Sequence, residues 1–378
     1  MKTRILVFSD WFAPGFRAGG PIQSLVNLTS TLTEFEFYIV TSDTDHHSTK
    51  PYDSIHANVW ITYREHIQVF YLSKDKLKAE IFAALIEEVH PQKIYLNSLF
   101  SPVFTLMPLR LLNQKPNDYS VVVAPRGMLK SSALNEKVLK KKIFLFAARI
   151  LGWYDRVTWH ATNSLECEEI KKHFGKDALV HIADNLASAP VDSIEKRVKI
   201  AGQVKMICLA RISPEKGIEE ALRFLESHHW ASGLHIDFIG AQQNEEFYRK
   251  CLAWSRQLQG VTCRFLGEMP PSEISSRWKE YHFLYLPTRG ENFGHAIAES
   301  LNNGVPVIIS DRTPWRNLKS LGVGWDLELS QASFLPIVKG ACAMGQDEYN
   351  QYSEAALAYA KQVYAASSRI QQSRGLFS

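Results

Sequence analysis

Two glutamates, Glu291 and Glu299, stand eight positions apart on either side of a predicted loop–helix junction. The apolar run 283–286 before them is short enough to be a buried strand, and a proline and a glycine then end it. Apolar residues at helical spacing predict a helix over 294–304, so Glu291 lies in the loop and Glu299 lies in the helix. The first N–H groups of a helix have no partner within it, so this loop is suited to hold phosphate or sugar oxygens. One loop residue and one solvated helix residue, with no shared task, is the alternative interpretation.

Two cations occupy a similar position in an earlier strand–turn–helix unit. Arg211 and Lys216 lie in the turn after the predicted strand 205–209. Arginine offers a planar fork of donors and lysine a point charge, and together they are suited to hold a pyrophosphate while charge develops on it. Two basic residues in a turn are also often simply solvated, which is the alternative here. Gly240, after the next predicted strand, is a further candidate from its position alone.

Near the start of the chain, glycines lie between a predicted strand, 4–8, and a predicted helix, 22–33. Glycine lets the backbone approach a ligand closely, so Gly19 and Gly20 are candidates for a binding loop. An ordinary tight connection would use the same residues.

Predicted strands and helices alternate through most of the chain, which is typical of a doubly wound parallel sheet. Ligands bind beyond the carboxyl ends of the strands in such sheets. Arg126 follows the predicted strand 120–124 and is therefore a candidate site residue, with a surface arginine in a loop as the alternative. The other expected strands are 37–41, 93–96, 235–239, 262–266 and 305–309, and the other expected helices are 76–89, 102–112, 165–174, 215–226, 245–257 and 272–280.

The bulk composition indicates a two-domain globular protein. A chain of 378 residues is too long for one ordinary core. The net charge of +4 is too small to indicate nucleic-acid binding. Five scattered cysteines without a CxxC pair are interpreted as reduced thiols of a cytoplasmic protein, not a zinc site or disulfide framework. We expect neither a signal peptide over 1–10 nor a transmembrane helix, because no apolar run is long enough.

A mixed polar stretch around Pro190, without clear periodicity, predicts a linker between the two domains. The last segment is rich in alanine and predicts one helix over 352–371. The expected organisation is a first domain over 1–187, a linker over 188–203, a second domain over 204–351, and a C-terminal helix and tail over 352–378.

A strongly basic stretch lies between Arg126 and Arg149, with seven basic residues and one acid, Glu136. Apolar residues interleave with the basic ones and predict a basic amphipathic helix over 137–149. Such a helix can lie on an anionic membrane surface. A core helix with a solvated basic face is the alternative.

The first motif resembles the signature of a known enzyme family. The run Glu291-Asn292-Phe293-Gly294, followed by Glu299 and a Gly-Val-Pro-Val stretch, resembles the E-x7-E signature of retaining glycosyltransferase family 4. The sequence that follows resembles a bacterial branch of that family that builds surface polysaccharides. The resemblance covers most of the chain, is densest over 205–325, and is looser over 5–30 and 120–170.

Other candidates also resemble residues of the family, or depart from them. Arg211 and Lys216 resemble its diphosphate-binding pair, and Gly19 and Gly20 resemble its N-terminal glycine loop, which faces the donor diphosphate and the acceptor. Many members carry a histidine where Arg126 stands. Arg126 can do similar electrostatic work, but the departure puts a proton-handling role in doubt.

The resemblance implies the GT-B fold, in which two Rossmann-like domains face each other across a cleft and a C-terminal helix crosses back to the first domain. It also implies a hexosyltransferase-type enzyme (EC 2.4). Such an enzyme moves a sugar from a nucleoside diphosphate sugar, with UDP expected, to a hydroxyl, with retention at the anomeric carbon. Asp43-Thr44-Asp45 matches a metal motif without support from the family, so we expect no metal and no cofactor.

The resemblance also implies roles for the candidate residues. Glu291 would hold donor sugar hydroxyls, and the amides of Asn292–Gly294 would hold sugar and phosphate oxygens. Glu299 would bind the ribose. Arg211 and Lys216 would stabilise the leaving diphosphate.

The implied partners are a nucleotide-sugar donor and a glycan or lipid-linked acceptor of lipopolysaccharide, capsule or exopolysaccharide biosynthesis. The implied location is the cytoplasm, with possible peripheral binding to the inner face of the cytoplasmic membrane. Two alternatives remain: another GT-B enzyme, such as a sugar-nucleotide epimerase or a phosphorylase, and a non-catalytic nucleotide-sugar-binding partner.

Overall fold

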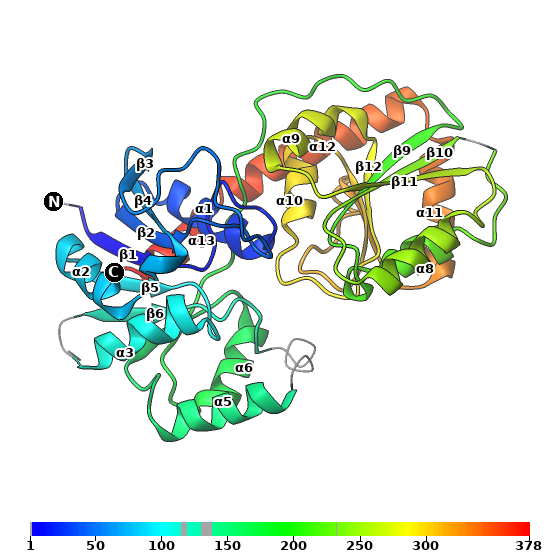
Figure 1. Ribbon diagram of the computed structural model, residues 1–378. Helices are drawn as coiled ribbons and strands as arrows, with labels where there is room; N and C mark the ends of the chain where they lie inside the picture. The colour runs from blue at the N-terminus through cyan, green and yellow to red at the C-terminus, as the bar shows by residue number, and fades with distance from the viewer. Residues whose placement is uncertain (1, 115–118, 130–137, 232) are drawn as a thin grey trace. The chain divides into compact units, whose positions relative to one another are not determined.

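The computed structural model describes residues 2–114, 119–129, 138–231 and 233–378. The chain forms two compact units, each built on a twisted sheet with helices packed on it (Figure 1). The first unit consists of Met1–Leu186 and Ser367–Ser378, and the second of Ala187–Ala366.

Within the described residues, the first unit has an eight-stranded sheet in the order β3-β4-β2-β1-β5-β6-β7-β8. All neighbouring strands are parallel except β3 and β4, which are antiparallel. The parallel strands confirm the predicted doubly wound arrangement. The antiparallel pair was not predicted. The strands are β1 (Arg4–Phe8), β2 (Glu36–Ser42), β3 (Trp60–Arg64), β4 (Ile67–Leu72), β5 (Lys93–Leu96), β6 (Ser120–Val123), β7 (Val157–Ala161) and β8 (Val180–Ile182).

Central strands of this sheet are buried on both faces. Successive side chains of a strand point to opposite faces, so each such strand contributes to two cores. In β1, Ile5 and Val7 join one core, and Leu6 and Phe8 join the other. Helix α1 contributes to the first core, and α2, α3, α5 and α6 contribute to the second. The helices of this unit are α1 (Gly20–Thr31), η1 (Lys74–Lys76), α2 (Ala79–Val89), η2 (Pro102–Leu106), α3 (Met107–Gln114), α5 (Val138–Ile150), α6 (Ser164–Phe174) and α13 (Ser367–Gly375).

The chain returns to the first unit at its C-terminal end. The tail predicted as one helix is two: α12 (Gln346–Tyr364) belongs to the second unit and α13 to the first. After α13, Phe377 is buried, and its ring centroid lies 5.6 Å from that of Phe35 and 5.7 Å from that of Tyr95. The break falls just before Ser367 and Ser368, which are residue types that favour helix starts.

The second unit has a six-stranded parallel sheet in the order β11-β10-β9-β12-β13-β14, again within the described residues. Its strands are β9 (Val204–Leu209), β10 (Leu234–Ile239), β11 (Val261–Gly267), β12 (Phe283–Leu286), β13 (Val307–Ser310) and β14 (Gly324–Leu327). Its other elements are η3 (Pro214–Lys216), α7 (Ile218–Arg223), α8 (Glu245–Ser255), α9 (Pro271–Arg277), η4 (Trp278–Glu280), α10 (His295–Asn302), α11 (Gln331–Ala343) and α12.

The helix predicted over 215–226 is interrupted. Gly217 has a φ of 69° and separates η3 from α7. A side chain on Gly217 would place its Cβ 1.8 Å from the carbonyl oxygen of Pro287, so only glycine lets these two loops approach. This interruption brings the turn after β9 against the loop after β12.

The segment predicted as a linker is packed against the second unit through Arg197, which is 7% exposed. Its guanidinium donates to the carbonyl oxygens of Asn303 at 2.7 Å, Trp278 at 3.2 Å and Gly304 at 3.3 Å. The carbonyls at the C-terminal end of α10 carry partial negative charge, which favours a cation there. Arg197 therefore fixes the end of the helix whose start forms the candidate site.

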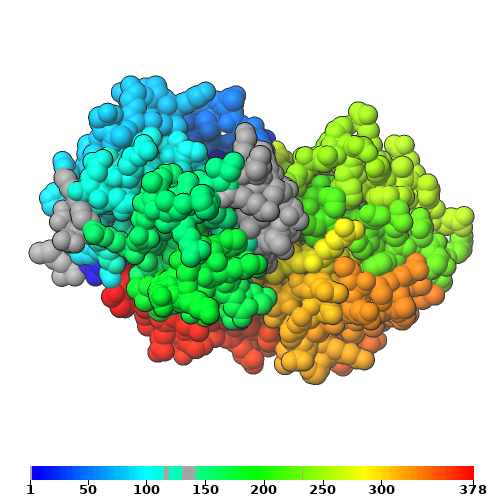
Figure 2. All heavy atoms as spheres, turned by 90° about the horizontal axis from the view of Figure 1, so that it is seen from below, coloured from blue at the N-terminus to red at the C-terminus, as the bar shows by residue number. Residues whose placement is uncertain are grey.

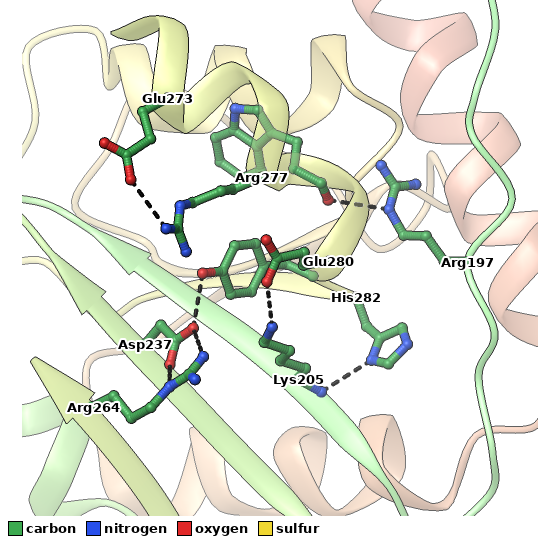
Figure 3. Close-up of polar contacts among 10 residues, drawn as sticks. Arg197, Lys205, Asp237, Arg264, Glu273, Arg277, Glu280 and His282 are labelled. Atoms are coloured by element: carbon green, nitrogen blue, oxygen red, sulfur yellow. Dashed lines mark hydrogen bonds and ion pairs between the residues drawn. The ribbon is translucent and has the colours of Figure 1, made fainter. Parts of the chain in front are cut away.

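A polar cluster inside the same unit fixes the strands that carry the site (Figure 3). Asp237, in the middle of β10 and 1% exposed, accepts from Arg264 Nε at 2.7 Å and Nη2 at 2.5 Å, and from Tyr281 Oη at 2.8 Å. Burial by itself would raise the pKa of Asp237, but the hydrogen bonds from Arg264 and Tyr281 lower it below the ordinary value. The cluster joins β10, β11 and the segment just before β12.

Candidate active site

The candidate residues of the second unit follow adjacent strands at one edge of its sheet. Arg211 follows β9, Gly240 follows β10, and Glu291 follows β12. The sheet order places β9 between β10 and β12, all parallel, so their carboxyl ends meet at this edge. This is where ligands bind in sheets of this kind.

Lys216 and Glu291 are in direct contact. Lys216 Nζ lies 2.7 Å from Glu291 Oε1, and the two side chains are 20% and 12% exposed. Thr288 Oγ1 donates to the same carboxylate oxygen at 3.4 Å. The structure thus brings a predicted cation and a predicted carboxylate together from segments 75 positions apart in the sequence.

Arg211 lies at the same edge but is more open. Its Nη2 is 3.5 Å from Glu215 Oε1, and the side chain is 46% exposed. The backbone of Gly240 packs closely on the turn after β9. A Cβ at this position would lie 2.0 Å from the carbonyl oxygen of Ala210. Gly240 therefore lets the two loops approach.

Helix α10 begins at this edge with its N-terminus open. Gly294 is the N-cap residue with a φ of 82°, and no side chain among the described residues caps the helix. The carbonyl oxygen of Phe293 accepts from Trp315 Nε1 at 2.5 Å, which fixes the loop. The buried Oδ1 of Asn292 has no hydrogen-bond partner among the described residues. The amides at this helix start, at the positive end of its dipole, suit an anion.

Glu299 lies in α10 and is half-buried. Its carboxylate accepts no hydrogen bond from the part of the chain that the structure describes. Burial raises the pKa of Glu299 from the ordinary 4.5 to about 7. A carboxylate in this state is suited to accept hydroxyl donors from a ligand.

The remaining predicted residues lie in the first unit. Arg126 follows β6, and its guanidinium is held by hydrogen bonds from three sides. Nearby, His160 is 2% exposed and bonded at both ring nitrogens, to Tyr95 and to the Ala183 carbonyl oxygen. His160 is therefore a structural histidine.

Gly19 and Gly20 begin helix α1. Gly19 has a φ of 68°, and a Cβ there would meet nothing within 4 Å, so backbone conformation and not crowding favours glycine. The loop before it is held by Asp45, whose carboxylate accepts from the backbone N–H of Phe16 at 2.9 Å and of Arg17 at 3.2 Å. Asp45 is thus an anchor of the glycine loop.

From the sequence, Asp45 was considered only as part of a metal motif, so this role was not predicted. The sequence feature that could have indicated it is the position of Asp45 shortly after the strand β2, which neighbours β1 in the sheet. Such a residue can reach the loop that leaves β1.

We expect Asp45→Ala to lower the free energy of unfolding by about 2–3 kcal/mol, because buried amides lose a charged acceptor. Urea unfolding of the full chain measures this. The control is Asp53→Ala, which removes a surface pair with Lys50 whose side chains are 83% and 75% exposed, and should cost under about 1 kcal/mol. Equal losses in both variants would contradict the anchoring role.

The sequence of the second unit matches a known family. Residues 192–318 match the family described as glycosyl transferases group 1. The matched range contains Arg211, Lys216, Glu291 and Glu299, and so includes the whole edge described above. This match confirms the predicted enzyme class, a glycosyltransferase (EC 2.4).

Similar solved structures extend over the whole chain. Sucrose-phosphate synthase from Thermosynechococcus elongatus has a TM-score of 0.69 and 13% identity, over 100% of this chain and 98% of that chain. HepE from Anabaena, in complex with UDP and glucose, has a TM-score of 0.66 and 14% identity, over 100% of this chain and 99% of that chain. The lipopolysaccharide outer core galactosyltransferase WaaB, in its apo form, has a TM-score of 0.60 and 14% identity, over 100% of this chain and 99% of that chain.

These likenesses confirm the predicted GT-B fold of two Rossmann-like domains. A comparison with curated protein sequences gives no significant match.

Proposed function

We propose that the protein is a retaining, metal-independent glycosyltransferase that moves a sugar from a nucleoside diphosphate sugar, with UDP expected, to a hydroxyl. The acceptor is a glycan or lipid-linked sugar of bacterial surface polysaccharide. The observation that carries this proposal is the contact between Lys216 and Glu291, beside the open start of helix α10. It sets a cation, a carboxylate and free amides around one place, as a sugar diphosphate requires.

In the proposed reaction, the bond between the anomeric carbon and the donor phosphate oxygen breaks, and the acceptor hydroxyl oxygen bonds to the same carbon. Arg211 and Lys216 take the charge that develops on the leaving diphosphate, together with the amides of Asn292–Gly294. Glu291 orients the sugar hydroxyls, and Glu299 accepts from the ribose. The acceptor proton leaves with the departing phosphate.

The finer parts of this proposal have support from similar proteins. HepE has been solved in complex with UDP and glucose, which favours a UDP-sugar donor. WaaB is a lipopolysaccharide outer core galactosyltransferase, which favours an acceptor of surface polysaccharide.

In the first unit, we propose that Gly19 and Gly20 face the donor and that Arg126 contributes a positive charge.

Ligand binding tests the proposed function directly. A bound nucleotide raises the melting temperature in proportion to the logarithm of its concentration over Kd. UDP-, GDP- and ADP-sugars should be screened by thermal shift, and the UDP-sugars are expected to give the largest shift. No shift with any nucleotide sugar at millimolar concentration would overturn the proposal.

Metal independence gives a separate prediction, because fixed cations and a helix N-terminus take the electrostatic role that a metal has in other enzymes. Release of the nucleoside diphosphate from the donor should proceed at an unchanged rate in excess EDTA. Loss of release in EDTA, with recovery on adding Mg²⁺ or Mn²⁺, would show that a metal is needed.

We further propose that helix α5 binds an anionic membrane. Three apolar residues of this helix, spaced three and four positions apart, are exposed: Ile143 (58%), Phe146 (68%) and Ile150 (67%). Leu145 and Ala148 are instead buried in the core. Figure 2 views this unit from the side on which α5 and α6 form the surface. The stretch is basic in sequence, although Lys130 and Lys137 lie outside the described residues. No helix in the described ranges is long and apolar enough to cross a membrane.

Vesicle flotation tests this membrane proposal. The protein should float with vesicles containing anionic lipid and be released by salt, because each basic residue near such a surface contributes about 1 kcal/mol. Phe146→Ser should reduce flotation. Leu321→Ser, at a leucine of the second unit that is 46% exposed, should not. Equal flotation with neutral vesicles, or none with either, would favour a solvated basic face.

A further inference from the structure

Arg126 is held in place without being neutralised. Its Nε donates to Asn97 Oδ1, its Nη1 to Asn185 Oδ1 and its Nη2 to Tyr95 Oη, each at 2.8 Å. All three acceptors are uncharged at neutral pH. No carboxylate of the described residues forms an ion pair with this guanidinium. Since a guanidinium has five N–H donors, two remain for a ligand.

Tyr95 and His160, which lie behind Arg126, are also neutral. Tyr95 Oη lies 2.7 Å from His160 Nδ1, and His160 Nε2 lies 2.9 Å from the carbonyl oxygen of Ala183. The carbonyl assigns the proton of His160 to Nε2, so Nδ1 accepts from Tyr95. Burial lowers the pKa of His160 to about 3 and raises the pKa of Tyr95 to about 12. Neither residue therefore offsets the charge of Arg126 at neutral pH.

The backbone at Arg126 is strained into the left-handed region, with a φ of 54°. This conformation is unfavourable for a residue that has a Cβ atom. The next residue, Gly127, donates its N–H to Glu166 at 2.5 Å, and the same side chain accepts from the Thr162 N–H at 2.7 Å. Glu166 is 2% exposed, so a buried carboxylate holds the turn and thereby aims Arg126. Strain of this kind is concentrated at binding sites.

The position of Arg126 also points to a ligand. Asn97, which holds its Nε, follows β5 and donates from Nδ2 to Ser9 Oγ at 3.2 Å. Ser9 follows β1, directly before the segment that leads to the glycine loop. A chain of hydrogen bonds thus runs along the carboxyl edge of β1, β5 and β6, where ligands bind in such sheets.

We propose that Arg126, held by Asn97, Asn185 and Tyr95, is a binding site for an oxyanion carried by the acceptor. This inference rests on the proposed function, which supplies the acceptor. A rigid guanidinium with free donors suits a phosphate or a carboxylate, and an anion would supply the charge that its three hydrogen-bond acceptors lack. The acceptor is therefore a phosphorylated or acidic sugar, or a sugar on a lipid diphosphate.

The test measures acceptor-side binding with UDP already saturating, so that the anion site of the second unit is filled. Calorimetry compares glucose 6-phosphate and glucuronate with glucose, and geranyl diphosphate with geraniol. At least one anionic probe should bind about tenfold or more tightly than its neutral counterpart, the scale of a hydrogen bond to a charged group. The probe that does so identifies the source of the oxyanion.

Two variants of the full chain sharpen the test. Arg126→Gln removes the charge, and Asn185→Asp keeps an oxygen beside Nη1 while supplying an internal carboxylate. Both should lose the preference for the anionic probe. Arg110→Gln, an exposed arginine of α3, should keep it.

The result that overturns the inference is equal binding of anionic and neutral probes by the unchanged protein. A preference that survives in either variant, with its melting temperature unchanged, overturns it equally. Failure of UDP itself to bind would instead count against the proposed function, so the two failures are distinguishable.

Discussion

Lys216→Ala and Arg211→Ala are each expected to weaken binding of the nucleoside diphosphate by about 1.5–3 kcal/mol, the range for hydrogen bonds to charged groups. Lys216 should lie at the upper end. It is only 20% exposed, and its loss would also leave the Glu291 carboxylate, which is 12% exposed, without its cation. Arg211 is 46% exposed, so water screens its charge more.

Isothermal titration of UDP measures both losses. The matched control is Arg249→Ala on helix α8, an arginine that is 75% exposed and pairs with Glu245 of the same helix. Its effect on UDP affinity should be negligible. If the control and both site variants bind UDP with the same affinity as the unchanged protein, Arg211 and Lys216 are not diphosphate ligands.

The second large effect separates the two glutamates. Glu291→Gln is expected to lower kcat strongly and leave UDP affinity nearly intact, because contacts with the reacting sugar strengthen as its bond to phosphate breaks. Glu299→Gln should instead weaken UDP binding and spare more of kcat, because a ribose contact is made about equally in the ground and transition states. Steady-state kinetics with calorimetry decide this. The reverse pattern would mean that the sugar and the ribose are exchanged along this motif.

Glu299 adds a pH dependence to that prediction. Its pKa is about 7 in the folded protein against an ordinary 4.5, so the folded state holds a proton that the unfolded chain releases over this window. Its burial therefore lowers the free energy of unfolding as the pH rises from about 4.5 to about 7, by about 3 kcal/mol. Glu299→Gln should be more stable than the unchanged protein at pH 8 and equally stable at pH 4.

The same ionisation should affect the ligand. Ribose hydroxyls donate best to the charged carboxylate, so UDP affinity should rise with pH through about 7. Since the UDP phosphate also titrates nearby, Glu299→Gln supplies the baseline, and only the difference between the two proteins reports on Glu299. Identical pH profiles would remove Glu299 from the ribose site.

The candidate site of the second unit could largely be predicted from the sequence, because it depends on local patterns. An apolar strand, a glycine-containing loop and an amphipathic helix place Glu291 before the start of α10 and Glu299 within it. The contact between Glu291 and Lys216 could not be predicted from such patterns, since it depends on the order of β9 and β12 in the sheet.

The less local features of the first unit could not be predicted. The antiparallel strands β3 and β4 are not among the strands expected from the sequence. The anchoring of the glycine loop by Asp45 and the neutral surroundings of Arg126 depend on side chains from distant segments. The expectation that Arg126 is either a site residue or a surface arginine did not foresee a guanidinium fixed by three neutral acceptors.

The central claim is that this protein transfers a sugar from a nucleoside diphosphate with retention at the anomeric carbon. Proton NMR of the first-formed product, from an α-linked UDP-sugar with a hexose acceptor or water, tests it most directly. We expect release of UDP together with an α-configured product, and loss of both in Glu291→Gln. A β-configured first product, or no UDP release from any UDP-sugar, would contradict the account.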